Sequence, residues 1–171
     1  MPGCALPDPC HRRGCPACYP ERAGHVRLLW TASRDWDDPV RMWRYLAGCA
    51  QRAAELGKTL VIVHGDNGAG DMIGKLFGRL TGGCADEPWP ADWAAPCTGR
   101  CKPGHRKRGK RGRDYCPAAG VYRNEEMVDS GVDACAAWIK DGSTGASGCA
   151  RLAAAAGVSV QRFRSSSSLA G

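Results

Sequence analysis

The chain has 171 residues, and its 24 Lys and Arg against 17 Asp and Glu give a formal net charge of +7. Eight of those cations and no acid lie in residues 100–113, RCKPGHRKRGKRGR, so the rest of the chain holds 16 basic (24 − 8) and 17 acidic residues. This distribution excludes a uniformly basic protein of the histone type. No stretch approaches the ~20 apolar residues of a membrane span, and the N-terminus lacks the apolar region of a secretory signal. We therefore expect a cytoplasmic protein without a membrane partner.

The first part of the chain predicts a Cys-rich arm followed by a strand, a helix and a second strand. Residues 1–24 are rich in Pro, Gly and Cys without periodicity, so we expect an arm outside the core. The apolar run at 26–32 predicts a buried strand. Asp-Asp-Pro at 37–39 predicts the start of a helix that Gly57 ends. The run TLVIVHG at 59–65 predicts a parallel strand covered on both faces.

The second part continues the alternation around an insertion. The Gly-rich turn at 65–70 leads into a helix that we expect to reach about Leu80. A third strand would fall within 84–93, although two prolines weaken it. Residues 94–119 are too polar and Gly-rich for a core, so they form an insertion. We then expect a helix at 123–130, a strand at 133–139, a turn at 142–148, an Ala-rich helix to Ala156 and a strand at 158–163. We expect residues 165–171 to form a disordered Ser-rich tail.

This order predicts an α/β fold over residues 25–164, with a Rossmann-like, mainly parallel sheet of about five strands and flanking helices. Ligands bind such sheets at the carboxyl ends of the strands, near the point where the strand order reverses. The loops at 31–34, 64–71 and 142–147 follow predicted strands. They are therefore the candidate site.

Two of these loops have the composition of an anion site. The segments HGDNGAGD and DGSTGAS each lead into a predicted helix, where unshielded backbone N–H groups can hold a phosphate or carboxylate. Neither is a Walker A loop or a GxGxxG fingerprint. Arg34 and Arg123 could clamp a phosphate with their planar guanidinium groups. The alternative is that the glycines serve only the turns, that both arginines make surface ion pairs and that Asp71 is only a helix-dipole partner.

The order and spacing of four short motifs resemble the YspA/YpsA-related branch of the SLOG superfamily. The motifs are TASRDW at 31–36, VIVHGDNGAGD at 61–71, ADW at 91–93 and GVYRNEEM at 120–127. The segment DGSTGASGCARLAAAAGVSVQRF also resembles that family's final turn, helix and strand. SLOG domains are Rossmann-like and similar to the LOG proteins and the DprA core. The resemblance covers about residues 26–164 without the insertion.

The resemblance implies a nucleotide or nucleotide-derived ligand in the strand-end cleft. Together with the strand-end positions, it assigns the following residues to ligand binding: Ser33, Arg34, His64, Gly65, Gly68, Asp71, Arg123, Asn124, Gly142, Ser143, Thr144 and Gly145. The chain departs from the family pattern in three places. Ala32 stands where the first loop usually has Gly, Ala69-Gly70-Asp71 replaces the usual Gly-Ala-Asp, and Ala146 follows Gly145 where Thr is usual.

The resemblance also leaves an enzymatic alternative open. LOG relatives cleave N-glycosidic bonds of nucleotides with an Arg and an acidic residue beside a Gly-Gly-x-Gly-Thr loop. Here Glu125 and Glu126 follow Arg123, and Asp71 lies across the expected cleft, so carboxylate chemistry is conceivable. The LOG signature is absent, and we interpret both glutamates as first-turn helix acids. Binding is our main hypothesis and a nucleotide N-glycosidic hydrolase is an alternative, with its catalytic residues unassigned.

The cysteines predict metal binding. Eleven Cys without an export signal do not suit a disulfide framework. The insertion supplies a Cys₃His set typical of structural zinc, which would order this polar segment: Cys97, Cys101, His105 and Cys116. The N-terminal arm could form a second zinc site or share the first: Cys4, Cys10, Cys15 and Cys18, with His11 as a spare ligand. The alternative is unconnected thiols in flexible segments.

The basic run within the insertion gives a third functional hypothesis. A zinc-anchored loop with eight cations suits contact with nucleic-acid phosphates. No aromatic residue lies within 100–113, and Tyr115 only adjoins it, so base stacking there is not indicated. A nucleic-acid-binding module built on 100–113 therefore stands as an alternative, beside a solvated charge run without a partner. The sequence predicts no oligomeric state.

Overall fold

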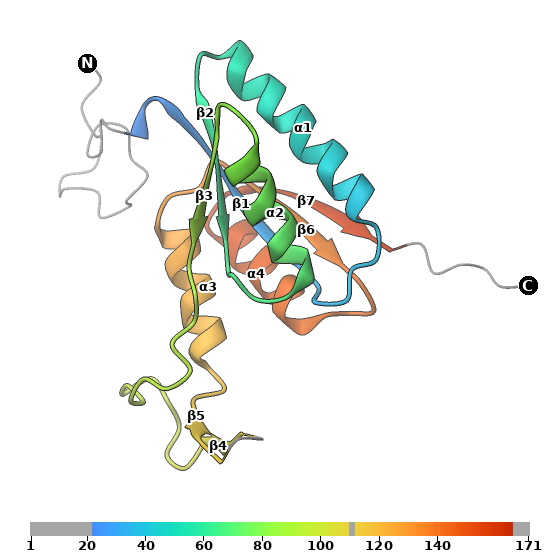
Figure 1. The fold of residues 1–171 in the computed structure, drawn as a ribbon. Coiled ribbons are helices and arrows are strands. Elements are labelled where there is room, and N and C mark those ends of the chain that lie inside the picture. The colour runs from blue at the N-terminus through green and yellow to red at the C-terminus, as the bar shows by residue number, and fades with distance from the viewer. Residues whose placement is uncertain (1–21, 110–111, 166–171) are drawn as a thin grey trace, which may run out of the picture.

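A computed structural model describes residues 22–109 and 112–165 (Figure 1). The four N-terminal cysteines and the Ser-rich tail beyond residue 165 lie outside the described residues. Expectations about a disordered tail and a second zinc site in the arm therefore stay predictions.

The described elements alternate along the chain almost as predicted. Their bounds are β1 His25–Ala32, α1 Pro39–Glu55, β2 Thr59–His64, α2 Ala69–Leu80, β3 Cys84–Pro88, β4 Lys107–Arg108, β5 Asp114–Tyr115, α3 Ala119–Asp129, β6 Ala134–Ile139, α4 Thr144–Ala155 and β7 Ser159–Arg164. Five strands form one sheet in the order β3-β2-β1-β6-β7, and every neighbouring pair is parallel. This confirms the predicted α/β fold with a Rossmann-like sheet.

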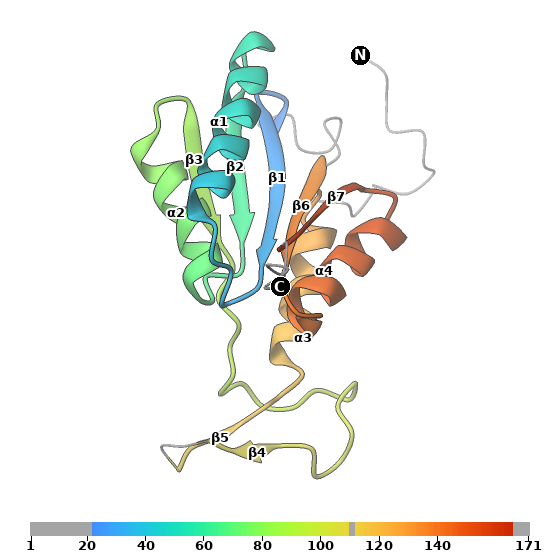
Figure 2. The ribbon, with the colours of Figure 1, turned by 90° about the vertical axis from the view of Figure 1, so that its right-hand side faces the viewer.

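Helices cover both faces of the sheet, which is why its central strands are almost entirely apolar. On one face, α1 and α2 enclose a core that includes the fully buried Trp30, Phe77 and Trp138. On the other face, α3 and α4 enclose a second core that includes Met127 and Cys149. Figure 2 shows the two helix pairs on opposite sides of the strands. The chain crosses from one face to the other between β3 and β6, so the strand order reverses between β1 and β6.

One local prediction is confirmed and two need correction. The third strand forms as the edge strand β3, because Pro88 is its last residue and an edge strand tolerates a missing donor there. Helix α3 begins at Ala119 rather than Arg123, because the N–H groups of Val121 and Tyr122 already bond to the carbonyl of Ala118. The expected turn at 142–148 is also shorter, because Ser143 serves as N-cap and α4 starts at Thr144.

The insertion between β3 and α3 contains the antiparallel pair β4–β5. In both ribbon views it projects beyond the carboxyl ends of the parallel strands (Figures 1 and 2). Within residues 22–109 and 112–165, no helix combines the length and apolar character needed to cross a membrane.

Candidate functional site

A cleft of about 910 Å³ opens at the carboxyl ends of β1, β2 and β6, at the point where the strand order reverses. This volume lies within the range of about 300–1,000 Å³ that is usual for ligand sites. Its walls are the loops after these strands and one face each of α3 and α4. Eight of the twelve residues predicted from the sequence line it: Arg34, Gly65, Asp71, Arg123, Asn124, Ser143, Thr144 and Gly145.

The other four predicted residues lie next to the cleft and shape it. Ser33 is buried and joins two strand ends, since its N–H donates to the Trp138 carbonyl at 2.8 Å and its Oγ accepts from the Lys140 N–H at 2.8 Å. Gly68 and Gly142 have φ angles of +95° and +68°, the left-handed region that favours glycine. Glycine at these two positions is therefore required by the turns themselves. The fourth residue, His64, lies beneath the loop that follows β2.

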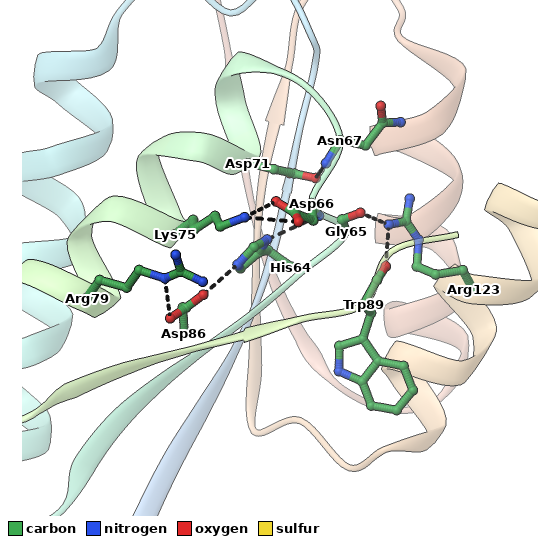
Figure 3. A network of polar contacts seen from close by, with 10 residues as sticks. All are labelled: His64, Gly65, Asp66, Asn67, Asp71, Lys75, Arg79, Asp86, Trp89 and Arg123. Carbon is green, nitrogen blue, oxygen red and sulfur yellow. Dashed lines mark hydrogen bonds and ion pairs between the residues drawn. The ribbon is translucent and has the colours of Figure 1, made fainter. Parts of the chain in front are cut away.

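The loop after β2 is held by a network of polar contacts (Figure 3). The Asp66 N–H donates to Nδ1 of the buried His64 at 3.1 Å, and Lys75 Nζ lies 2.8 Å from Oδ1 of Asp66. The Asn67 N–H donates to the Asp71 carboxylate at 3.0 Å. These contacts fix the backbone that forms the floor of the cleft.

His64 has a structural place in this network. Burial lowers its pKa, so the imidazole is neutral near pH 7, and Nδ1 already accepts from the Asp66 N–H. Its Nε2 faces the Asp86 carboxylate at 3.7 Å, and Arg79 pairs with the same carboxylate at 3.0 Å. Because this contact points toward β3, the imidazole supports the loop from below and does not line the cleft.

Arg123 connects three parts of the cleft wall. Its Nη1 donates to the carbonyls of Gly65 and Trp89, the latter at 2.8 Å, and its Nε donates to Oδ1 of Asn124 at 3.0 Å. A Cβ at Gly65 would collide with the guanidinium group, which explains the glycine. Burial lowers the pKa of Arg123, but the neighbouring Asp71 carboxylate opposes that shift. Arg123 thus holds the β2 loop against α3, and its Nη1 is already used in hydrogen bonds within the protein.

Asp71 places a buried carboxyl group in the cleft. Burial raises its pKa from 3.8 to about 6, although the Asn67 N–H and the Arg123 charge favour the ionised form. Such a group accepts hydrogen bonds from hydroxyls near pH 7, and its pKa also suits general acid–base work.

Glu125 and Glu126 do not line the cleft. Because α3 starts at Ala119, neither lies in its first turn, which corrects our interpretation of them. Glu125 instead pairs with Arg100 of the insertion. Of the three carboxylates considered for hydrolysis, the cleft contains Asp71 alone.

Two further basic residues of the cleft were missed. Lys140 follows β6 and is paired with Asp37 at 2.6 Å. Arg151 lies on α4 and is exposed. Helical spacing could have identified Arg151, because it follows the predicted Thr144 by seven residues and so shares its helix face. Asp35 and Asp141 add negative charge to the rim.

The insertion brings the four predicted metal ligands together: Cys97, Cys101, His105 and Cys116, whose ligand atoms all lie within 4.8 Å of one another. Nε2 of His105 lies 3.0 Å from Sγ of Cys97 and 3.4 Å from Sγ of Cys116. Cys101 and Cys116 are 3.9 Å apart at sulfur. This Cys₃His cluster can hold a metal ion.

Two of the eight insertion cations are used to build the segment around this cluster. Arg106 donates to the carbonyls of Ala95 at 2.8 Å and Asp114 at 3.0 Å. Arg100 pairs with Glu125 and lies over the Tyr122 ring, with its Cζ 4.5 Å from the ring centroid. The four other described cations of the insertion are exposed: Lys102, Lys107, Arg108 and Arg113. Lys110 and Arg111 lie outside the described residues.

Most of the chain is similar to a known phage protein. It is 34% identical over 141 residues to the Gene 61 protein of Mycobacterium phage D29, covering 80% of this chain and 95% of the phage protein. The chain belongs to the Gene 61 protein family. No family model matches the chain, and no solved structure matches it. The shared length shows that the Gene 61 family relationship extends over most of both chains.

Proposed function

We propose that this Gene 61 family member binds a nucleotide or nucleotide-derived ligand in the strand-end cleft. The observation that carries the proposal is that arginine side chains, the N-terminus of α4 and a buried carboxylate line one cleft at the reversal point of the strand order. Membership of the SLOG superfamily is part of this proposal. The parallel order β3-β2-β1-β6-β7 and the position of the cleft support it.

The phosphate end of the ligand would lie against α4 and the exposed arginines. Ser143 makes no side-chain cap, so the first N–H groups of the 12-residue helix α4 remain available to an anion. Arg34 and Arg151 line the same cleft and can each donate two parallel hydrogen bonds to a phosphate. The buried Asp71 carboxylate suits ribose hydroxyls, as the acidic residue of dinucleotide sites does. A simple inorganic anion would not use this carboxylate.

Thermal unfolding and calorimetric titration with nucleotides and ADP-ribose test the proposal. We expect at least one of these ligands to raise the Tm, and Arg34→Ala and Arg151→Ala each to weaken its binding about 10-fold, the value of a charge-assisted hydrogen bond. Arg44→Ala is the matched control, because Arg44 is exposed on α1 and does not line the cleft. The proposal fails if no nucleotide or ADP-ribose derivative shifts the Tm.

We further propose that the metal of the Cys₃His cluster is structural zinc. Bond lengths of about 2.3 Å to sulfur and about 2.0 Å to nitrogen give tetrahedron edges of about 3.5–3.8 Å, close to the 3.4 and 3.9 Å separations at Cys116. Four protein ligands leave no open position, which is typical of structural sites. Metal analysis should find at least one zinc per chain, and Cys101→Ser should lower that number. Cys84→Ser on β3 is the control, and equal zinc in both variants would exclude this site.

Nucleic-acid binding by the insertion is a second candidate function. The observation in its favour is that Lys107, Arg108 and Arg113 are exposed on a segment that projects away from the sheet (Figure 2). Deletion of residues 98–115 should then abolish salt-dependent binding to DNA or RNA. Affinity that survives the deletion would contradict this function.

A further inference from the structure

An exposed tryptophan stands at the wall of the cleft. Trp93 lies between β3 and the insertion, lines the cleft, and is 37% exposed. Ligand sites are clefts lined largely by apolar and aromatic side chains, so an accessible indole in the lining of this cleft is a candidate ligand contact.

Three contacts hold Trp93 in this place. Its carbonyl accepts a hydrogen bond from the Cys116 N–H at 2.9 Å, which ties it to the metal cluster. Its ring meets Tyr115 edge-on, with the ring centroids 6.3 Å apart and the planes at 75°. It also packs on Gly120, where an added Cβ would lie 3.0 Å from the indole. The ring is therefore positioned by its surroundings before any ligand enters.

The cleft offers both polar and apolar contacts. Arg34, Ser143 and Thr144 line it after β1 and β6, and Trp93 lines it together with Pro117 and with Val121, which is 51% exposed. A nucleotide can use both kinds of contact, because it combines charged phosphates with a flat aromatic base.

We propose that the nucleobase of the bound ligand stacks on the indole of Trp93. This inference rests on the proposed nucleotide-binding function and adds the residue that recognises the base. Stacking on an aromatic side chain is tolerant of base identity and changes affinity by about 10- to 100-fold. The binding site is then completed by the segment that joins β3 to the insertion, and the parallel sheet alone does not supply it.

Other aromatic residues near the site are less suited to this role. Trp89 is half-buried, and its indole N–H donates to Glu87 at 2.9 Å. Tyr122 is covered by the Arg100 guanidinium and contacts Cys101 through its hydroxyl at 3.4 Å. Neither lines the cleft.

Calorimetric titration with AMP, GMP, CMP and UMP, and with ribose 5-phosphate, separates stacking from phosphate binding. We expect Trp93→Ala to weaken nucleotide binding 10- to 100-fold and to leave ribose 5-phosphate binding unchanged, whereas Trp93→Phe keeps most of the nucleotide affinity. Trp43→Ala is the matched control, because Trp43 is 39% exposed on α1 and packs against Phe77 outside the cleft. Thermal unfolding and metal content of each variant show whether the fold and the cluster are retained.

The outcomes distinguish two failures. Wild-type affinity for nucleotides in a folded, metal-containing Trp93→Ala protein overturns the stacking inference alone. An equal loss of ribose 5-phosphate binding in that variant overturns it as well, because the defect is then not specific to the base. If the wild-type protein binds none of these ligands, nor any other nucleotide or ADP-ribose derivative, the stacking inference fails together with the proposed function.

Discussion

The methyl group of Ala32 fills the space that a side chain at Gly70 would need. An added Cβ at Gly70 would collide with Cβ of Ala32 and lie 3.0 Å from the Ser33 carbonyl oxygen. Ala32 ends β1 and Gly70 lies in the first turn of α2, so the contact joins two loops of the cleft. These two positions are also where the sequence departs from the SLOG pattern of Gly in the first loop and Ala in the second.

This relationship predicts a rescue by double substitution. Gly70→Ala should lower the free energy of unfolding by about 1–3 kcal/mol through overpacking, and Ala32→Gly by about 0.5–1 kcal/mol. The pair Ala32→Gly/Gly70→Ala should recover most of the loss, because one methyl group then occupies the space again. Urea unfolding of all four proteins measures the coupling energy.

A glycine without neighbours provides the control for this double-mutant cycle. Gly48 lies in α1 with no atom within 4 Å of an added Cβ, so Gly48→Ala should be neutral or stabilising by up to about 1 kcal/mol. Strictly additive effects of Ala32→Gly and Gly70→Ala would show that the two sites do not share the space.

The raised pKa of Asp71 predicts that the free energy of unfolding falls between about pH 4 and pH 6. The unfolded chain loses this proton near pH 3.8 and the folded protein near pH 6, so the folded state holds more protons in this window. Stability from this group is therefore complete below pH 3.8 and is lost as pH rises through 6, by up to about 3 kcal/mol.

Asp71→Asn should flatten this dependence and raise the stability at pH 7, because its side-chain oxygen can still accept the Asn67 N–H. Urea unfolding from pH 4 to pH 8 provides the measurement, with the exposed Asp129→Asn as control. An unchanged pH profile in the Asp71 variant would mean that its carboxyl is not buried as described.

Metal removal should weaken ligand binding without unfolding the sheet domain. The Cys116 N–H bonds to the Trp93 carbonyl, so the Cys₃His cluster and the cleft share one backbone contact. Chelation, or the substitution Cys97→Ser at an exposed ligand, should lower AMP affinity while far-UV circular dichroism changes little. Cys84→Ser should match the wild type. Full AMP affinity in metal-free protein would show that the cleft does not depend on the cluster.

Two core thiols should resist modification in the folded protein. Burial raises the pKa of Cys135 to about 12 and that of Cys149 to about 11, and both side chains are almost fully buried. Because the thiolate is the reactive form, a disulfide reagent at pH 8 should leave both unmodified until urea unfolds the chain. Peptide mass spectrometry identifies the modified positions. Rapid labelling of Cys149 in native protein would contradict the buried α4 packing.

The sequence predicted the structure best where a single physical requirement decides which residues can stand at a position. The apolar run at 59–65 had to be a central strand, and the Cys₃His spacing brought its four ligands together. The cleft was predicted less completely, because burial and pairing decide whether a polar residue faces a ligand. His64 and Arg123 had the right residue types, yet neutral imidazole packing and carbonyl hydrogen bonds make them supports of the β2 loop. Trp93 belonged to a recognised motif, but its exposure depends on the path of the insertion.

The single hydrogen bond between Trp93 and Cys116 has a consequence for how this protein can vary. It brings together the two ends of the segment that separates them, since the donor and acceptor atoms are 2.9 Å apart. A segment with adjacent ends can be shortened, exchanged or removed while the flanking strand and helix keep their positions. Residues 94–115 can therefore change in length or sequence while the parallel sheet keeps its course.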